Sequence, residues 1–133
     1  MTNYTSTKEG FQQSMLESLL GPPEKAEEYG RLNATDNFYH IFNGERSDFN
    51  GWVKGIAEWR GKVSDYKPVV DQFLRQDDSL AAHMIGTIKV DGVATTFESF
   101  MFGKVENETG KLEWLIERSI WGATGQVPEH GVD

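Results

Sequence analysis

The sequence predicts an α+β fold in which helices come first and an antiparallel sheet follows. Apolar residues in the first part of the chain recur at helical spacing, whereas from about residue 65 onward they alternate with a period of two. The chain has 133 residues, which is room for one domain with one core. We therefore expect residues 1–133 to form a single domain, with 123–133 as a C-terminal tail.

The first half of the chain is expected to hold three helices and one strand. A helix is predicted over residues 6–20, where a Gly-Pro-Pro run ends it, and a second, short helix over 23–32. Residues 37–43 are dense in aromatic and β-branched side chains and predict a strand. Asp48 can cap a third helix at about 48–61. Helices followed by a run of strands are the α+β order.

The second half predicts a four-strand meander, with strands at 65–76, 79–90, 93–105 and 111–122. The pair Asp91-Gly92 between two alternating runs is the strongest hairpin signal of the sequence. A two-residue turn there pairs Val90 with Val93 and His83 with Phe100. His83, Glu98, Phe100 and Phe102 then share one face of the sheet, with Glu98 diagonal to His83.

The register of the last hairpin has two solutions. A four-residue loop, Asn107 to Gly110, places Glu117 on the face of Glu98 and gives two carboxyl groups on one wall. A three-residue loop ending in the same glycine shifts the last strand by one residue, so that Arg118 lies on that face instead and pairs with Glu98.

Composition and charge exclude several classes of partner. The formal net charge is −8, and a surface this acidic repels phosphate backbones and anionic lipid. We expect no nucleic-acid and no membrane partner, and the polar N-terminal segment favours a cytoplasmic location. There is no cysteine, which excludes thiolate chemistry, and the three histidines show no ligand spacing for a metal.

Element order, strand lengths and a few local matches resemble one cone-shaped family, which includes nuclear transport factor 2, the ketosteroid isomerases and the SnoaL-like polyketide cyclases. The resemblance covers about residues 7–122. The segment Asp36 to His40 falls where ketosteroid isomerases carry their general base, with histidine in place of aspartate. Glu98 falls at the position of their hydrogen-bonding acid. In the last strand, Leu115, Glu117 and Ser119 correspond to pocket-facing residues, which favours the four-residue loop.

The resemblance implies a pocket for an apolar small molecule, enclosed by a curved antiparallel sheet and the helices packed on it. His40 would act as base or proton shuttle, with Glu98 and Glu117 as proton donor and hydrogen-bonding acid. Two carboxyl groups on one apolar wall cannot both ionise easily, so one stays protonated and can donate to a carbonyl oxygen. The expected substrate-binding residues are Phe38, Trp59, His83, Phe100, Phe102 and Leu115.

The other face of the last strand is apolar as well. Trp114, Ile116 and Ile120 share it with Arg118, and Phe97 and Met101 are expected across the hairpin. A sheet that is apolar on both faces is covered on both. We therefore expect a homodimer through the outer face of the sheet.

The leading functional hypothesis is a cofactor-independent isomerase or cyclase that acts by general acid–base chemistry on an apolar, natural-product-like molecule of secondary metabolism. No metal and no cofactor are expected. One alternative is a non-catalytic small-molecule-binding or protein-docking module, because fold alone does not settle function. A second alternative is a dehydratase or epoxide hydrolase, for which Asp65, Asp71 and Arg118 are the only loose candidates.

Overall fold

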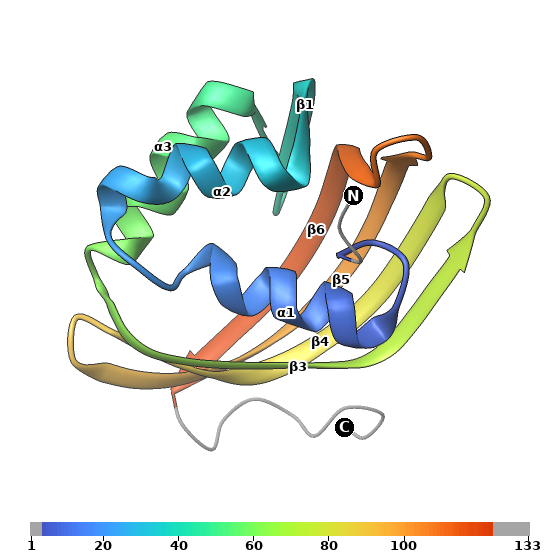
Figure 1. Ribbon diagram of the computed structural model, residues 1–133. Helices are drawn as coiled ribbons and strands as arrows, with labels where there is room; N and C mark the ends of the chain where they lie inside the picture. The colour runs from blue at the N-terminus through green and yellow to red at the C-terminus, as the bar shows by residue number, and fades with distance from the viewer. Residues whose placement is uncertain (1–3, 124–133) are drawn as a thin grey trace.

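The computed structural model describes residues 4–123, and the predicted tail lies outside this range except for its first residue. The elements follow the expected order, with one strand added (Figure 1). Their bounds are α1 Lys8–Ser18, η1 Pro23–Lys25 (a 3-10 turn), α2 Ala26–Asn33, β1 Ala34–Phe42, β2 Glu45–Asp48, α3 Phe49–Arg60, β3 Val63–Gln76, β4 Ser79–Val90, β5 Val93–Glu106 and β6 Lys111–Ala123.

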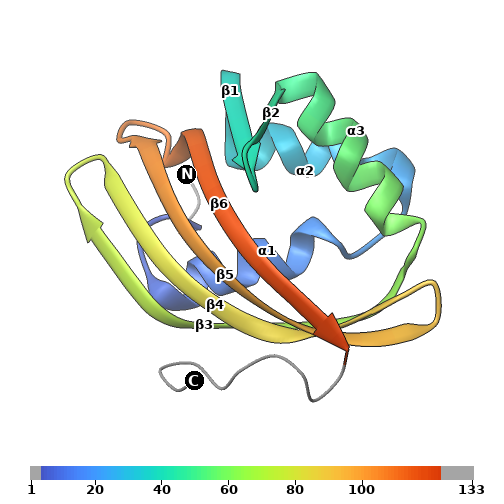
Figure 2. The ribbon, with the colours of Figure 1, turned by 180° about the vertical axis from the view of Figure 1, so that it is seen from behind.

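Within residues 4–123, six strands form one strongly curved sheet in the order β2-β1-β6-β5-β4-β3 (Figure 1). Neighbouring strands are antiparallel except β1 and β6, which are parallel. The described helices α1, α2 and α3 lie on the concave side of the sheet, which we call the inner face (Figure 1). Seen from behind, the convex side, or outer face, has none of the described helices over it (Figure 2).

The register of the β4–β5 hairpin is as predicted. Val90 pairs with Val93 and His83 pairs with Phe100. At the turn Asp91 and Gly92 have φ of 49° and 81°, the left-handed conformation that a two-residue hairpin turn requires. This hairpin confirms that His83, Glu98, Phe100 and Phe102 share one face of the sheet.

The β5–β6 hairpin has the predicted four-residue loop but not the predicted pairing. Glu106 pairs with Lys111, as that loop requires, yet Lys104 pairs with Trp114 because Glu113 is an extra residue in β6. Such a β-bulge shifts the register of everything beyond it by one. Glu98 therefore faces Ile120, and the expectation that Glu98 and Glu117 share a wall is wrong.

The short strand β2 was not predicted, although its signal is in the sequence. Asn43 and Gly44 have φ of 49° and 90° and join β1 to β2 in a hairpin. An Asn-Gly pair after a strand is a strong hairpin signal. The Asn43 side chain also fixes the turn to β6, since its Oδ1 accepts from the Ser119 amide at 2.8 Å and its Nδ2 donates to the Ser119 carbonyl at 3.2 Å.

Caps and one arginine hold the helices over the inner face. Thr7 and Asp48 accept hydrogen bonds from the first-turn amides of α1 and α3, at 2.9 and 2.8 Å. Arg60, the last residue of α3, donates to the carbonyls of Glu17 and Ser18 at 2.9 and 3.0 Å. Both carbonyls belong to the last turn of α1, where the usual helical partner four residues on is missing. Arg60 therefore ties the ends of α1 and α3 together.

Candidate functional site

A cavity of about 310 Å³ lies between the helices and the inner face of the sheet. Most of its lining is apolar or aromatic, from Met15 of α1 and Leu19 just after it, through Trp52 and Ile56 of α3, to Met84 of β4. Its polar side chains include His40 of β1 and Glu117 of β6, two strands that run side by side. An apolar pocket of this size with a few convergent polar groups is the usual form of a small-molecule site.

A histidine–glutamate pair forms the polar centre of this cavity. His40 of β1 and Glu117 of β6 both line it, and the distance from His40 Nε2 to Glu117 Oε1 is 3.1 Å. Their side chains are 16% and 14% exposed. The His40 ring lies between the rings of Phe38 and Phe42, with centroid distances of 6.4 and 5.9 Å. The pair is therefore a desolvated acid–base unit with aromatic neighbours.

Aromatic rings form one wall of the cavity. Trp59 at the end of α3 stacks on Trp121 of β6 at 5.8 Å, Trp121 stacks on Phe97 at 5.6 Å, and Phe97 stacks on Tyr66 of β3 at 5.9 Å. Gly86 makes room for this row, because a Cβ there would lie 2.8 Å from the Phe97 ring. The wall offers flat apolar surfaces to a ring-shaped ligand.

Tyr66 is a pocket residue that the sequence analysis did not identify. It lines the cavity from β3, and burial raises the pKa of its phenol above the ordinary value of 10.0. The negative charge of Glu117 raises this pKa further, with a smaller contribution from Tyr29. The phenol therefore keeps its proton and can act as a hydrogen-bond donor. Its only signal in the sequence was its place in an alternating strand, on the same side as Val70.

Of the expected pocket residues, the structure places Trp59, Leu115, His40 and Glu117 in the cavity lining. Phe38 is 1% exposed and belongs to the core beside His40, where it packs on Trp52 at 4.4 Å.

Four other expected residues are not in the cavity. The Glu113 bulge places Glu117 and Glu98 on opposite faces of the sheet. Since Glu117 lines the cavity on the inner face, Glu98 lies on the outer face. That face also carries His83, Phe100 and Phe102. For the same reason, Phe97 and Met101 face the core instead of joining Arg118 on the outer face. Phe100 and Phe102 pair with Arg118 and Ile116 there.

A second histidine cluster occupies the outer face. His83 Nδ1 lies 2.6 Å from Asp71 Oδ1, and His83 Nε2 lies 2.7 Å from Glu98 Oε2. Asp71 is the extra residue of a bulge in β3, between the pairs Val70–Met84 and Gln72–His83. The bulge lets the Asp71 side chain reach the imidazole from the neighbouring strand.

Two opposing effects set the pKa of His83. Burial of the imidazole disfavours its charged form and acts to lower the pKa. The hydrogen bonds to Glu98 and Asp71, together with the attraction of both carboxylates, outweigh burial and raise the pKa above the ordinary 6.5. With a carboxylate on each ring nitrogen, the charged form of the imidazole persists to a higher pH than in a free histidine.

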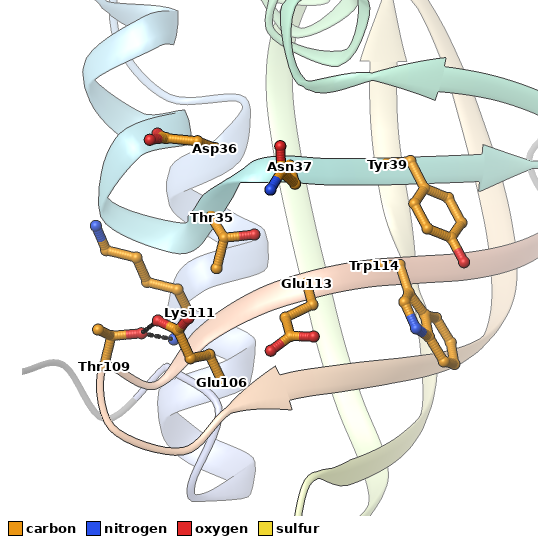
Figure 3. Close-up of a pocket in the computed structure, with 9 residues that line it drawn as sticks. All are labelled: Thr35, Asp36, Asn37, Tyr39, Glu106, Thr109, Lys111, Glu113 and Trp114. Atoms are coloured by element: carbon orange, nitrogen blue, oxygen red, sulfur yellow. Dashed lines mark hydrogen bonds between the residues drawn. The ribbon is translucent and has the colours of Figure 1, made fainter.

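An open, polar recess lies beside the edge of the sheet where β1 separates from β6 (Figure 3). The register of this parallel pair shifts in the same region, between Ala34 and Tyr39. Its volume is about 590 Å³, and charged side chains such as Asp36, Lys111 and Glu113 line much of it. It lacks the apolar walls and the acid–base pair of the inner cavity, so we take the inner cavity as the candidate site.

The described residues carry no group of three or more histidine and acidic side chains arranged to hold a metal ion. His130 lies outside this range. None of the helices within residues 4–123 is long and apolar enough to cross a membrane.

Comparison with known proteins gives matches in structure alone, since no family model and no curated protein matches the chain. A protein from Catenulispora acidiphila with a ketosteroid isomerase-like fold, in complex with trimethylamine, is 8% identical over 91% of each chain, with a TM-score of 0.66. A pinacolase from Penicillium brevicompactum is 8% identical over 81% of this chain and 76% of its own, with a TM-score of 0.66. A putative SnoaL-like polyketide cyclase from Shewanella denitrificans is 7% identical over 82% and 89%, with a TM-score of 0.65.

Identities this low speak for the fold alone, and at that level they confirm the resemblance found in the sequence. The chain has the cone-shaped fold shared by the nuclear transport factor 2-like proteins, the ketosteroid isomerases and the SnoaL-like cyclases.

Proposed function

We propose that the protein is a cofactor-independent isomerase or cyclase that uses His40 and Glu117 for acid–base chemistry on an apolar, natural-product-like small molecule. The observation that supports this most is the desolvated His40–Glu117 pair, with 3.1 Å between Nε2 and Oε1, in a largely apolar cavity of about 310 Å³. A charged or strongly polar ligand would lose its hydration against these walls.

In the proposed reaction the pair moves one proton within the substrate. His40 takes the proton from an acidic C–H group next to a carbonyl, and the Glu117 carboxylate stabilises the imidazolium that forms. The protonated pair has no net charge, which suits an apolar cavity. Return of the proton to a second carbon completes an isomerisation. In the alternative, the enolate carbon attacks a carbonyl carbon of the same molecule and closes a ring, and the oxygen of that carbonyl takes the proton back from His40.

The developing enolate oxygen needs a hydrogen-bond donor. The Tyr66 phenol is the candidate, because it lines the cavity and burial keeps it protonated. Ser99 and Ser119, whose hydroxyl groups lie 2.9 Å apart on the same wall, provide a second possible donor. Glu98, expected as the hydrogen-bonding acid, has no part in this proposal because it lies on the outer face.

The test is hydrogen–deuterium exchange at acidic C–H positions in a panel of apolar ketones and enones, followed by NMR in D₂O. We expect His40→Gln and Glu117→Gln each to slow exchange by roughly 10² to 10⁴-fold, the usual contribution of a general acid or base. Glu113→Gln, on the same strand but outside the cavity, is the matched control and should exchange as the wild type does.

The alternative of a binding module predicts a different result. Ligands from the panel would bind in the cavity, but His40→Gln and Glu117→Gln would leave any exchange unchanged, and this outcome would refute the enzyme proposal. The epoxide hydrolase alternative has less support. Asp71 and Arg118 lie on the outer face, and Asp65 is exposed beside Lys67 at 3.8 Å.

We also propose a homodimer through the outer face. Phe100, Phe102 and Ile120 are neighbours on that face and are 47%, 62% and 52% exposed. Contiguous exposed apolar side chains of this kind usually mark an interaction surface. Sedimentation of the wild type should show a dimer, and Phe100→Asp should give a monomer, because a charged carboxylate would replace the apolar ring at the centre of the face.

A further inference from the structure

Gly55 lies in the middle of α3, and neither packing nor backbone conformation accounts for a glycine there. A glycine inside a helix lowers stability relative to alanine, because it loses more conformational freedom on folding. The φ of Gly55 is negative, a conformation that any helix residue adopts. A Cβ at this position would meet none of the described atoms within 4 Å beyond its own stretch of helix. Alanine would therefore fit, and the glycine needs another explanation.

Two other helix glycines show the contrast. A Cβ on Gly30 of α2 would lie 2.8 Å from the Val53 side chain, so glycine there lets α2 and α3 approach closely. A Cβ on Gly51 would lie 3.3 Å from the carboxylate of Asp48, which caps α3. Both glycines are explained by the atoms packed against them. Gly55 has room beside it instead, and positions that break a local rule without a packing reason are most often functional.

The room beside Gly55 belongs to the inner cavity, near its opening. Gly55 is half-buried and lines the cavity together with Gly51 and Trp59, one turn before it and one turn after it on the same helix face. Gly51 is exposed, and Trp59 and Trp121 are 40% and 39% exposed. Lining residues that are also open to solvent mark the place where the cavity opens. A side chain at position 55 would lean toward the N-terminus of α3 and cover part of this opening.

The acid–base pair lies deeper than this opening. His40 and Glu117 line the same cavity, and their side chains are only 16% and 14% exposed. Phe42 and Trp59 also belong to the lining and provide apolar surface. Burial of an apolar chain beside such side chains favours binding, whereas a charged group there would lose its hydration.

We propose that Gly55 determines the size of the ligand, by leaving room for an apolar substituent that extends from the His40–Glu117 pair toward the opening. The inference rests on the part of the proposed function that places an apolar small molecule in the inner cavity. It adds that the ligand is longer than its reacting end and that position 55 selects for this length. A larger side chain at position 55 would occupy the same room, so it would reject long ligands and still accept short ones.

A homologous series of phenyl n-alkyl ketones, from acetophenone to hexanophenone, tests this selection, with binding measured by isothermal titration calorimetry. In the wild type the dissociation constant should fall by about three- to fourfold for each added CH₂ group, the usual gain for burying one. Gly55→Leu should bind acetophenone within about threefold of the wild type but hexanophenone at least about tenfold more weakly. Gly55→Met, which also adds a long side chain with good helix propensity, is the second variant and should show the same selectivity.

Two controls separate this effect from a change in the helix. Lys54→Leu adds the same side chain to an exposed position of α3 outside the cavity lining, and it should bind the series as the wild type does. Gly55→Ala should raise the melting temperature, because alanine favours the helix and its Cβ has room. A lower melting temperature in Gly55→Ala would contradict the inference. Far-UV circular dichroism verifies that each variant is folded.

The outcomes for this inference and for the proposed function are distinct. If none of the ketones binds the wild type, both are refuted. If the ketones bind but Gly55→Leu and the wild type depend on chain length in the same way, only the inference on Gly55 is refuted. If Gly55→Leu loses the long ketones while His40→Gln leaves hydrogen–deuterium exchange unchanged, the inference on Gly55 stands and the enzyme proposal fails.

Discussion

The sheet carries a histidine–carboxylate cluster on each face, and the two clusters are built differently. On the inner face His40 has one carboxylate, Glu117, and a cavity next to it. On the outer face His83 has a carboxylate on each ring nitrogen. An imidazole that exchanges protons with a ligand needs a nitrogen or a partner oxygen within the ligand's reach. In His83 both nitrogens are engaged by carboxylates, which favour the charged form of the ring. The same residue types therefore suit chemistry on one face and association on the other.

The largest expected difference between the clusters is in catalysis. His40→Gln should lower turnover by roughly 10² to 10⁴-fold with little loss of stability, because it removes the proposed base. His83→Gln should lower turnover by less than about tenfold, since it lies across the sheet from the cavity. Steady-state kinetics on a substrate identified by the exchange panel measures the turnover of both variants. A larger loss of turnover in His83→Gln than in His40→Gln would contradict the proposed role of His40 as the base.

The next difference concerns packing on the two faces of β5. Phe97→Ala should lower the free energy of unfolding by about 3 to 5 kcal/mol, because the ring is 3% exposed and stacks on Tyr66 and Trp121. Phe102→Ala, at 62% exposure, should cost less than about 1 kcal/mol in the folded monomer. Both substitutions are measured by urea denaturation in the Phe100→Asp variant, which we expect to be monomeric, so that dimerisation does not contribute to the free energy of unfolding. Equal losses would show that the outer face is as tightly packed as the core.

A smaller effect is expected in the pH dependence of stability. Since folding raises the pKa of His83 above 6.5, the folded protein binds more protons than the unfolded chain between 6.5 and the raised value. Stability from this group is complete below pH 6.5 and is lost as the pH rises through the folded pKa, with a slope of at most about 1.4 kcal/mol per pH unit. Urea denaturation from pH 6 to 9 measures the slope, and His83→Gln should flatten it. A slope unchanged in that variant would assign the effect to another group.

The smallest expected effect lies on the inner face. Ser119→Ala removes the hydrogen bond to the Ser99 hydroxyl, which is 2.9 Å long and joins two neutral groups. Such a bond contributes about 0.5 to 1.5 kcal/mol. Thermal denaturation against the wild type gives the value, with Ser64→Ala, an exposed serine of β3, as the control. A decrease in the free energy of unfolding of more than about 3 kcal/mol would contradict this expectation, because it exceeds the contribution of one neutral hydrogen bond.

Much of the fold could be predicted from local pattern. Period and turn chemistry placed three helices and the four long strands, and the Asp91-Gly92 turn fixed the pairing of His83 with Phe100. Within the β4–β5 hairpin, the residues of each face followed from alternation. Which face holds the cavity did not, because the Glu113 bulge inverts the last strand relative to β5.

The two bulges are the reason why the site was predicted only in part. A bulge in which the extra residue keeps a common backbone conformation needs no glycine, so neither Asp71 nor Glu113 carries a mark in the sequence. The first bulge brings Asp71 to His83, and the second brings Glu117 into the cavity with His40. Both clusters therefore depend on extra residues in a strand, which strict alternation with a period of two does not predict.

The stack of Trp59 on Trp121 gives the cavity an optical reporter. Two indole rings 5.8 Å apart and 28° from parallel are close enough for their electronic transitions to couple, and both line the cavity. A flat ligand that slides between or against them changes their coupling and their emission. Intrinsic fluorescence and circular dichroism can therefore follow occupancy of the cavity directly, so compounds can be screened for binding before any reaction is known.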